Sequence, residues 1–517
     1  MKSLVRGAAL IRWYAKKAWR GLLNERFQPY RYPKGRGMVN HYDLSGNHLT
    51  RRAFIGSGTV AAVAAFLPRR GVGGESSCVA AYYEPYLTEV SRRIRAHSSS
   101  CDTGFFFVTD QHVKSNCGQS GRLVAELIRR TGIVRVFSGG DLVEAFGEGY
   151  PTDKAAVDFA IDGYRRKWVS PIRAAGGRLY SAKGNHDFTV RHSMDSDEPV
   201  RGYTMGGAAA RDLIVGEWTE RDIVSHSNDP CACYYYHDDV GAKIRFVVLD
   251  TTDSEDSGDV AWGVRYGVHD RQLAWLAEVA LGSLPSDYDL VVMHHIPLTG
   301  VVGNERETSI FANLRDVLEA YQNRGRMTIA GRTYDFARAT GRILVDLTGH
   351  HHSERQTFQN GILHVTEPCD AAYEDYIVGS MPWCGALPKK VRGTIAEQTF
   401  DVVQISRDRR LLHFTRVGGG QGRTIHCTAK KLKVGETLKL EPEVLSGKVS
   451  FACYDGDSVT LLPNPKNRWN KLVAYKSDFA TIASDGTLTA KAPGPVMVVL
   501  RTEGLEKELY PLIITPA

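Results

Sequence analysis

Three consecutive histidines, His350, His351 and His352, follow Gly349, shortly after the apolar run 343–347. Alternate residues of an extended chain point the same way, so His350 and His352 can share one direction while His351 faces away. Neutral imidazoles directed at one point are ligands that a divalent transition metal prefers. The alternative is a solvated histidine-rich loop, and these four residues alone do not separate the two interpretations.

Side chains of similar chemistry follow four other short apolar runs. The runs and the residues behind them are 104–108 before Asp110 and His112, 133–137 before Asp141, 178–182 before Asn185, His186 and Asp187, and 290–293 before His294 and His295. Short continuous apolar runs predict strands buried on both faces. Amphipathic stretches between the runs predict helices at about 121–130, 153–175, 270–281 and 309–322. Because open α/β sheets place their ligands outside the carboxyl ends of the strands, the pattern favours one shared metal site.

Composition predicts a soluble globular protein of two domains. The chain has 517 residues, of which 43% are hydrophobic and 24% are charged. Its net charge of +7 is concentrated at the front: residues 1–70 hold 14 of the 65 Lys and Arg but only 2 of the 58 Asp and Glu. The remainder is mildly acidic, so no nucleic-acid partner is indicated.

Residues 1–77 are predicted to be a leader with an export signal. The pair Arg51 and Arg52 is followed by the apolar segment 53–67, an order that resembles a twin-arginine signal. The segment is too short and glycine-rich for a membrane span. We therefore expect export to the periplasm, or to a cell-surface or extracellular location. The start at Met1 or Met38, lipidation at Cys78 and the pairing of the nine cysteines stay open.

The ordered set of motifs resembles the calcineurin-like metallophosphoesterase family. The set is Asp-x-His at 110–112, Gly-Asp at 140–141, Gly-Asn-His-Asp at 184–187, a strand-end histidine, and Gly-His-x-His at 349–352. This resemblance implies an α/β fold of two packed mixed β-sheets flanked by helices, an αββα sandwich. The corresponding domain is predicted at 78–424, with an insertion at 188–240 that lacks clear periodicity.

The resemblance also implies a dinuclear centre with divided ligands. Its metal ligands would be Asp110, His112 and His352 for the first ion, Asn185, His295 and His350 for the second, and Asp141 as the bridge. Mixed nitrogen and oxygen ligation suits two divalent or trivalent transition metal ions, Fe, Zn or Mn, whose identity the sequence does not give.

Two pairs of adjacent residues have members with different expected roles. Strand alternation lets only one of His294 and His295 face the site, and the family pattern, a ligand two residues before proline, selects His295. His186 is implied to face the phosphoryl group as a catalytic residue, and Asp187 is predicted to orient it through a hydrogen bond.

Residues 425–517 resemble a different family. Short alternating runs separated by turns predict a small all-β sandwich, and the segments 434–438 and 480–490 resemble a bacterial immunoglobulin-like domain of group 2. Such domains act as spacers or adhesion units, so contact with a cell surface or with glycans is implied for this part of the chain.

The function expected from these patterns is that of an exported, dinuclear-metal-dependent phosphoric ester hydrolase, a phosphatase or phosphodiesterase. A hydroxide generated by the metals would attack a phosphate monoester or diester. Substrate choice is expected to depend on residues 188–240 and 369–395. The rival interpretation is a surface binding or adhesion protein that keeps an inactive phosphoesterase fold.

Overall fold

A computed structural model gives the fold of this chain. It divides the chain into two compact units, Met1–Gly73 and Gly74–Ala517. The structure describes residues 79–113, 116–143, 154–187, 207–253, 260–261, 264–299, 310–371, 390–391, 393–455, 460–462, 472–474, 476–502 and 506–517. The predicted export signal and Cys78 lie outside these residues, as do large parts of the segments predicted to select the substrate.

Two mixed sheets form the centre of the second unit. The first has the strand order β20-β25-β26-β17-β16-β15-β1-β2-β3, with β18 also paired to β26. Its strands are β1 (Thr103–Val108), β2 (Arg135–Ser138), β3 (Arg178–Ser181), β15 (Thr399–Ser406), β16 (Leu411–Gly418), β17 (Gly422–His426), β18 (Lys430–Lys433), β20 (Ser450–Asp455), β25 (Gly494–Arg501) and β26 (Glu506–Thr515). The strands β1, β2 and β3 run parallel, whereas β1 and β15 are antiparallel.

The second sheet has the order β13-β14-β12-β9-β6-β5-β4. Its strands are β4 (Val224–Ser225), β5 (Tyr235–Asp239), β6 (Ile244–Val248), β9 (Asp289–Met293), β12 (Ile343–Thr348), β13 (Arg355–Gln359) and β14 (Ile362–Thr366). The central strands β6, β9, β12 and β14 are parallel, so the carboxyl ends of β9 and β12 lie at the same edge.

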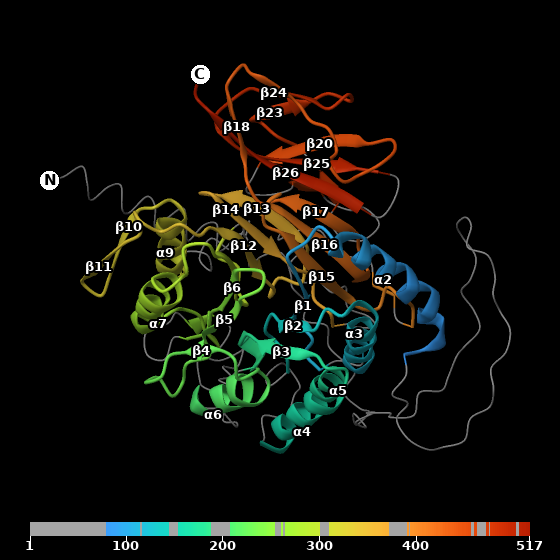
Figure 1. Ribbon diagram of the computed structural model, residues 1–517, viewed down its shortest axis with the longest axis vertical. Helices are drawn as coiled ribbons and strands as arrows, with labels where there is room; N and C mark the ends of the chain where they lie inside the picture. The colour runs from blue at the N-terminus through green and yellow to red at the C-terminus, as the bar shows by residue number, and fades with distance from the viewer. Residues whose placement is uncertain are drawn as a thin grey trace, which may run out of the picture. The chain divides into compact units, whose positions relative to one another are not determined.

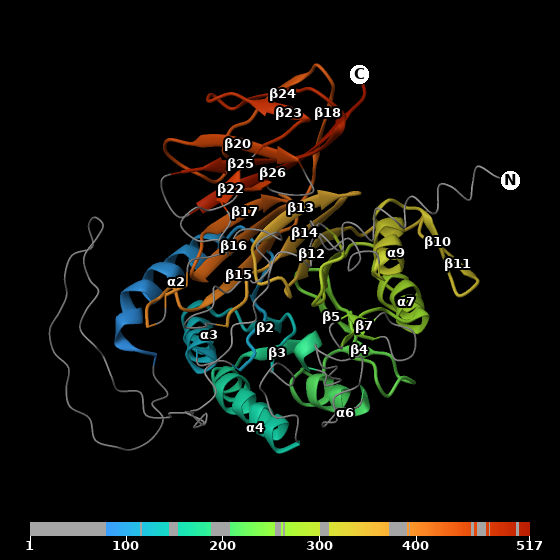
Figure 2. The same cartoon turned by 180° about the vertical axis from the view of Figure 1, so that it is seen from behind.

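Helices cover the outer face of the second sheet and, in the first sheet, that of β1, β2, β3, β15 and β16 (Figures 1 and 2). The helices are η1 (Ala81–Tyr83), α2 (Glu84–Ser98), α3 (Cys117–Thr131), α4 (Lys154–Tyr164), η2 (Arg165–Val169), α5 (Ser170–Ala174), η3 (Asn185–Asp187), α6 (Gly207–Arg211), η4 (Asp212–Glu217), α7 (Asp270–Trp275), η5 (Leu276–Leu281) and α9 (Ala312–Gln322). Helices α2, α3 and α4 share a buried cluster with the first sheet, and α7 and α9 share another with the second sheet.

The alternation of side chains along each strand divides the core into layers. In β1, Phe105 and Phe107 point into the cluster between the two sheets, whereas Phe106 and Val108 point toward α2 and α3. In β9, Val291 and Met293 face the space between the sheets, and Leu290 and Val292 face α7 and α9. The described residues thus form two mixed sheets flanked by helices, as the sequence predicts.

Several elements differ from the predicted ones. The single helix predicted at 153–175 consists of three consecutive helical elements, α4, η2 and α5, and Pro171 stands in the first turn of α5. The predicted insertion 188–240 includes β5 and β4, which extend the second sheet beyond β6 at one edge. A hairpin of β10 (Arg326–Ile329) and β11 (Arg332–Asp335) was not anticipated, and neither were β13 and β14.

The C-terminal residues continue the first sheet. The small strands β19 (Thr437–Lys439), β23 (Ala480–Ile482) and β24 (Thr487–Ala490) form a separate three-stranded sheet, and β21 (Thr460–Leu462) pairs with β22 (Leu472–Ala474). The predicted domain boundary at 424 falls inside β17, which pairs in parallel with β26. The immunoglobulin-like identity of this region stays a prediction.

Two further observations concern the predicted location of the protein. Within the described part of the chain, no helix is long and apolar enough to cross a membrane. The seven cysteines that the structure describes are all free thiols, so it supplies no disulfide pairing.

The remaining described strands are β7 (Val260–Ala261) and β8 (Val264–Arg265), which pair with each other.

Candidate metal centre

The predicted site residues lie in five loops, each directly after the carboxyl end of a strand. The loops follow β1, β2 and β3 of the first sheet and β9 and β12 of the second. Their backbones are unusual, because five of the predicted ligands have a positive φ: Asp110 (56°), His112 (49°), Asp141 (53°), His350 (68°) and His352 (56°). Residues other than glycine adopt a positive φ only at a cost in free energy, and such backbone strain concentrates at functional sites.

One group of ligand atoms comes from Asp110, His112, Asp141 and His352. These four side chains each offer one atom, and the atoms lie within 4.8 Å of one another. The Nε2 atoms of His112 and His352 face each other at 3.4 Å, and His352 Nε2 lies 3.2 Å from Asp110 Oδ1. Ligand atoms about 2.1 Å from a shared ion stand about 3 Å apart, so this spacing suits a metal between them.

A second group comes from Asp141, His295 and His350. Asn185 belongs to it by distance, because its Oδ1 lies 3.0 Å from His295 Nε2 and 2.8 Å from His350 Nδ1. His295 Nε2 lies 3.1 Å from Asp141 Oδ2. Asp141 is therefore the residue shared by both groups, where a bridging carboxylate would stand.

Adjacent His294 and His295 point in different directions. His295 Nδ1 donates to the carbonyl oxygen of Gly139 at 2.9 Å, which turns Nε2 toward the second group. His294 Nε2 instead lies 2.7 Å from Asp346 Oδ1, and its Nδ1 lies 3.0 Å from the carbonyl oxygen of Ile296. His294 thus lies outside the groups of ligand atoms. This is the arrangement that strand alternation requires.

The charges in the centre favour a cation. Asp110 and Asp141 are almost completely buried. Burial would lower the pKa of His295, but the carboxylates of Asp141 and Asp110 raise it to about 10. Burial likewise would raise the pKa of Asp141, yet the nearby His295 and His186 lower it well below its usual value. Two buried carboxylates surrounded by imidazole nitrogens fit the transition metals expected from the sequence.

His186 and Asp187 sit beside the two groups. The backbone amide of His186 donates to Asp141 Oδ1 at 2.7 Å, and the His186 ring packs edge-on against His112 with centroids 4.6 Å apart. Asp187 is buried, and its two oxygens accept hydrogen bonds from the amides of Val143 and Gly184 at 2.8 and 2.9 Å. Burial and then the charge of Asp141 raise the pKa of Asp187 to about 7. These contacts join the loop after β3 to the loop after β2, and the orientation of His186 by Asp187 stays a prediction.

His351 is buried beside the two groups and belongs to neither. Its backbone amide donates to the carbonyl oxygen of Gly349 at 2.8 Å, which tightens the turn between His350 and His352. The lone His364 pairs with Asp346, at 2.7 Å between Nδ1 and Oδ2. Tyr266, which the sequence analysis did not single out, packs edge-on against His350 at 5.8 Å.

A buried ion pair that the motifs do not reveal lies beside the site. Lys183 precedes the Gly-Asn-His-Asp motif, is buried, and lies 2.7 Å from Asp250 Oδ2. Asp250 follows β6 in the same way that the predicted ligands follow their strands. A signal was therefore present: a carboxylate directly after a sixth buried apolar run.

No family model matches the chain, and no curated protein matches it. Among solved structures, it is similar to GAP50, the anchor in the inner membrane complex of Plasmodium, at 12% identity and a TM-score of 0.33, over 61% of this chain and 84% of that one. It is also similar to the phosphopantetheinyl hydrolase PptH of Mycobacterium tuberculosis, at 12% identity and a TM-score of 0.23, over 52% of this chain and 91% of that one. A predicted phosphoesterase of Streptococcus pneumoniae matches at 11% identity and a TM-score of 0.21, over 63% of this chain and 90% of that one. Likenesses at these TM-scores are too remote to carry an inference about this chain.

Proposed function

We propose that this protein is a metal-dependent phosphoric ester hydrolase with a dinuclear centre. The observation that carries the proposal is the pair of ligand groups sharing the buried carboxylate of Asp141. Five loops that are distant in the sequence bring these atoms together. The same residues form the ordered motifs that resemble the calcineurin-like metallophosphoesterases.

The proposal divides the ligands between two ions. Asp110, His112 and His352 would hold one ion, Asn185, His295 and His350 the other, and Asp141 both. Bound together, two Fe, Zn or Mn ions would lower the pKa of a water toward neutrality and neutralise charge on a phosphate. The hydrogen bond from His295 Nδ1 to Gly139 fixes which nitrogen of that ring is offered to the ion.

His186 is the candidate for proton transfer to the leaving oxygen. Its side chain is 26% exposed, whereas those of His112 and Asp141 are 1% exposed, so His186 can reach a substrate that the ligands hold. Its backbone is anchored on Asp141, which keeps its distance from both groups constant. Asp187 would act by holding the loops after β2 and β3 together.

Hydrolysis of chromogenic phosphate esters tests the activity. A diester and the matching monoester should be assayed side by side with added Mn²⁺ or Zn²⁺, since the ligands are the same for both substrate classes. Asp141→Asn removes the shared charge and is expected to abolish both activities. Asp158→Asn, which alters an exposed ion pair with Lys154, should leave them unchanged. Full activity of the Asp141→Asn protein would refute the bridging role.

Metal analysis separates the enzyme from the rival adhesion protein. An inactive phosphoesterase fold would be expected to have lost ligands, whereas all seven predicted ligands are present in this chain. The proposal requires about two tightly held transition metal ions per purified chain. Protein that binds none would leave the adhesion interpretation standing.

We propose further that the protein is exported and that its C-terminal region meets a cell surface or glycans. The twin-arginine pattern at 51–52 and the basic charge of the first 70 residues support export. Replacing Arg51 and Arg52 together by Lys should retain the precursor in the cytoplasm, as measured by cell fractionation. Unchanged export of that variant would refute this route.

A further inference from the structure

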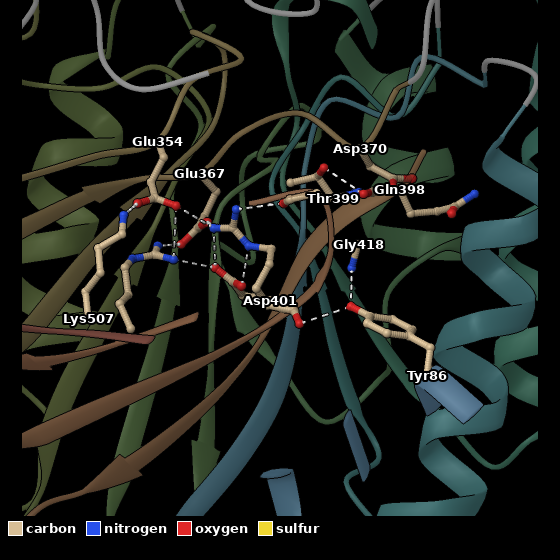
Figure 3. A network of polar contacts seen from close by, with 12 residues as sticks. Tyr86, Glu354, Glu367, Asp370, Gln398, Thr399, Asp401, Gly418 and Lys507 are labelled. Carbon is tan, nitrogen blue, oxygen red and sulfur yellow. Dashed lines mark hydrogen bonds and ion pairs between the residues drawn. The ribbon is translucent and has the colours of Figure 1, made fainter. Parts of the chain in front are cut away.

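Six charged side chains, five buried and one (Lys507) partly buried, form a compact group that we call the ion cluster. Its members are the carboxylates Glu354, Glu367 and Asp401 and the cations Arg416, Arg423 and Lys507 (Figure 3). Three carboxyl groups thus face three cations. Five of the six residues are at most 6% exposed, so their charges are stabilised by one another and hardly by water.

The two arginines bridge the carboxylates. Arg416 donates from Nε and Nη2 to the two oxygens of Asp401 at 2.7 and 3.0 Å, and from Nη2 to Glu354 at 2.9 Å. Arg423 donates to Asp401 Oδ2 at 2.8 Å and also pairs with Glu367. Bidentate guanidinium contacts of this kind fix position as well as charge.

Two residues of the ion cluster stand at the ends of the loop that carries His350 and His352. Glu354 stands two residues after His352. At the other end of the loop, the backbone amide of Glu367 donates to the carbonyl oxygen of Thr348 at 2.8 Å. Both histidines have a positive φ, and a strained backbone persists only where its surroundings hold it. The ion cluster is therefore in a position to set the direction of both imidazoles.

Lys507 brings the C-terminal region into this arrangement. It lies on β26 and donates to Glu354 Oε1 at 2.9 Å. In the parallel pairing of β17 with β26, Lys507 is the register partner of Arg423. Two cations side by side repel, so this pairing is favourable only because the carboxylates stand next to them.

We propose that Lys507 is a positioning residue for the metal centre. Through Glu354 it holds the loop of His350 and His352, so the C-terminal β-region takes part in metal binding. This inference rests on the proposed function, because it requires the two histidines to be ligands.

Calorimetric titration of metal-stripped protein with Zn²⁺ tests the role of Lys507 without relying on activity. Loss of a residue that orients ligands weakens metal binding by about 10- to 100-fold. We expect a loss of about 10-fold or more for Lys507→Met, and recovery in Lys507→Arg, which keeps the positive charge. Lys439→Met is the matched control, since Lys439 lies in the same region and pairs with the exposed Asp485. It should bind Zn²⁺ as the wild type does.

A double variant distinguishes the loss of ligand positioning from misfolding of the protein. Lys507→Met combined with Glu354→Gln leaves two cations and two carboxylates, so no buried ion lacks a counterion. We expect it to keep a cooperative unfolding transition and still to bind Zn²⁺ about 10-fold more weakly than the wild type. Wild-type affinity for Zn²⁺ in Lys507→Met and in the double variant would overturn the positioning role alone. A wild-type protein that binds no metal would overturn the proposed function, and the positioning role with it.

Discussion

His186 differs from the neighbouring histidines in its access to solvent. The predicted ligands in contact with it are buried, but about a quarter of its own side chain is exposed. Its amide is bound to Asp141 and its ring to the edge of His112. A group with these properties can meet a substrate oxygen without entering the coordination of the metals.

Replacing His186 by Asn should therefore separate catalysis from metal binding. General acid catalysis contributes about 10²- to 10⁴-fold, so kcat should fall by about 10²-fold or more for an alkyl ester. The fall should be smaller for a nitrophenyl ester, whose leaving group needs no proton. Steady-state kinetics and metal analysis of the same preparation measure both effects. His226→Asn, in the loop after β4, is the control, and equal losses with both esters would contradict proton donation.

The predictable residues are those whose signal is local. Asp110, Asp141 and His350 each follow an apolar run, so type and position together reveal them. Asp346 also gave a signal, as a lone carboxylate within a buried strand, but its partners His294 and His364 come from β9 and the adjacent β14. Which histidine turns to Asp346 and which to the metals depends on the pairing of strands, and a single sequence does not contain that pairing.

At the scale of elements, the sequence predicts best the strands that are apolar. The strands β1 and β9 are mainly apolar and were anticipated, as was β12 with its single carboxylate Asp346, whereas β13 was not. Its residues Arg355, Gln356 and Thr357 are polar and nevertheless buried. Hydrophobic patterns indicate burial only when the buried side chains are apolar. The ion cluster lay beyond prediction for the same reason.

Glu508 shows how a polar side chain of β26 fastens a loop. It is buried, and it accepts hydrogen bonds from the backbone amides of Glu443, Val444 and Leu445 and lies 2.9 Å from His426 Nε2. Burial would raise the pKa of Glu508, but the hydrogen bonds from His426, Tyr510 and these amides lower it. The loop before β20 is therefore held by an ionised carboxylate.

Substituting Glu508 by Gln should destabilise the protein in a pH-dependent way. Because the folded pKa lies below the unfolded value of about 4.3, the carboxylate stabilises the fold above that pH, and the stabilisation is lost as the pH falls through the folded pKa. We expect a loss of about 1–3 kcal/mol at pH 7 and a shrinking difference from the wild type below about pH 4. Urea unfolding at several pH values measures it. Glu443→Gln, which affects an exposed pair with Arg409, should change stability by less than about 1 kcal/mol. A difference that grows on acidification would contradict the assignment.

At the scale of the whole molecule, the C-terminal strands belong to two cores at once. In β25, Met497 and Val499 point into the cluster that includes Phe105 between the two sheets. Val498 and Leu500 point to the opposite face, into a cluster made of C-terminal residues. A detachable spacer would bury only its own interior. The strands β25 and β26 instead contribute side chains to both the central cluster and the C-terminal cluster.

A chain that ends at residue 428 should accordingly fail to fold. The truncation removes Tyr454, Met497, Val499 and Leu509 from the central cluster, at about 2 kcal/mol for each buried side chain. A loss of about 8 kcal/mol is comparable with the whole stability of an ordinary protein, about 5–15 kcal/mol. It also exposes the edge of β17, which invites aggregation, and it leaves Glu354 without Lys507.

Calorimetry of the truncated and the full chain under the same conditions tests this expectation. The full chain should unfold in a cooperative transition, and the truncated chain should show none or be insoluble. A spacer of the kind implied by the immunoglobulin-like resemblance would give the opposite result, because its removal would leave the transition of the remaining residues in place. A truncated chain that unfolds at the temperature of the full chain would therefore show that β25 and β26 are dispensable for the fold. The contribution of Lys507 to holding the loop of His350 and His352 would then have to be small.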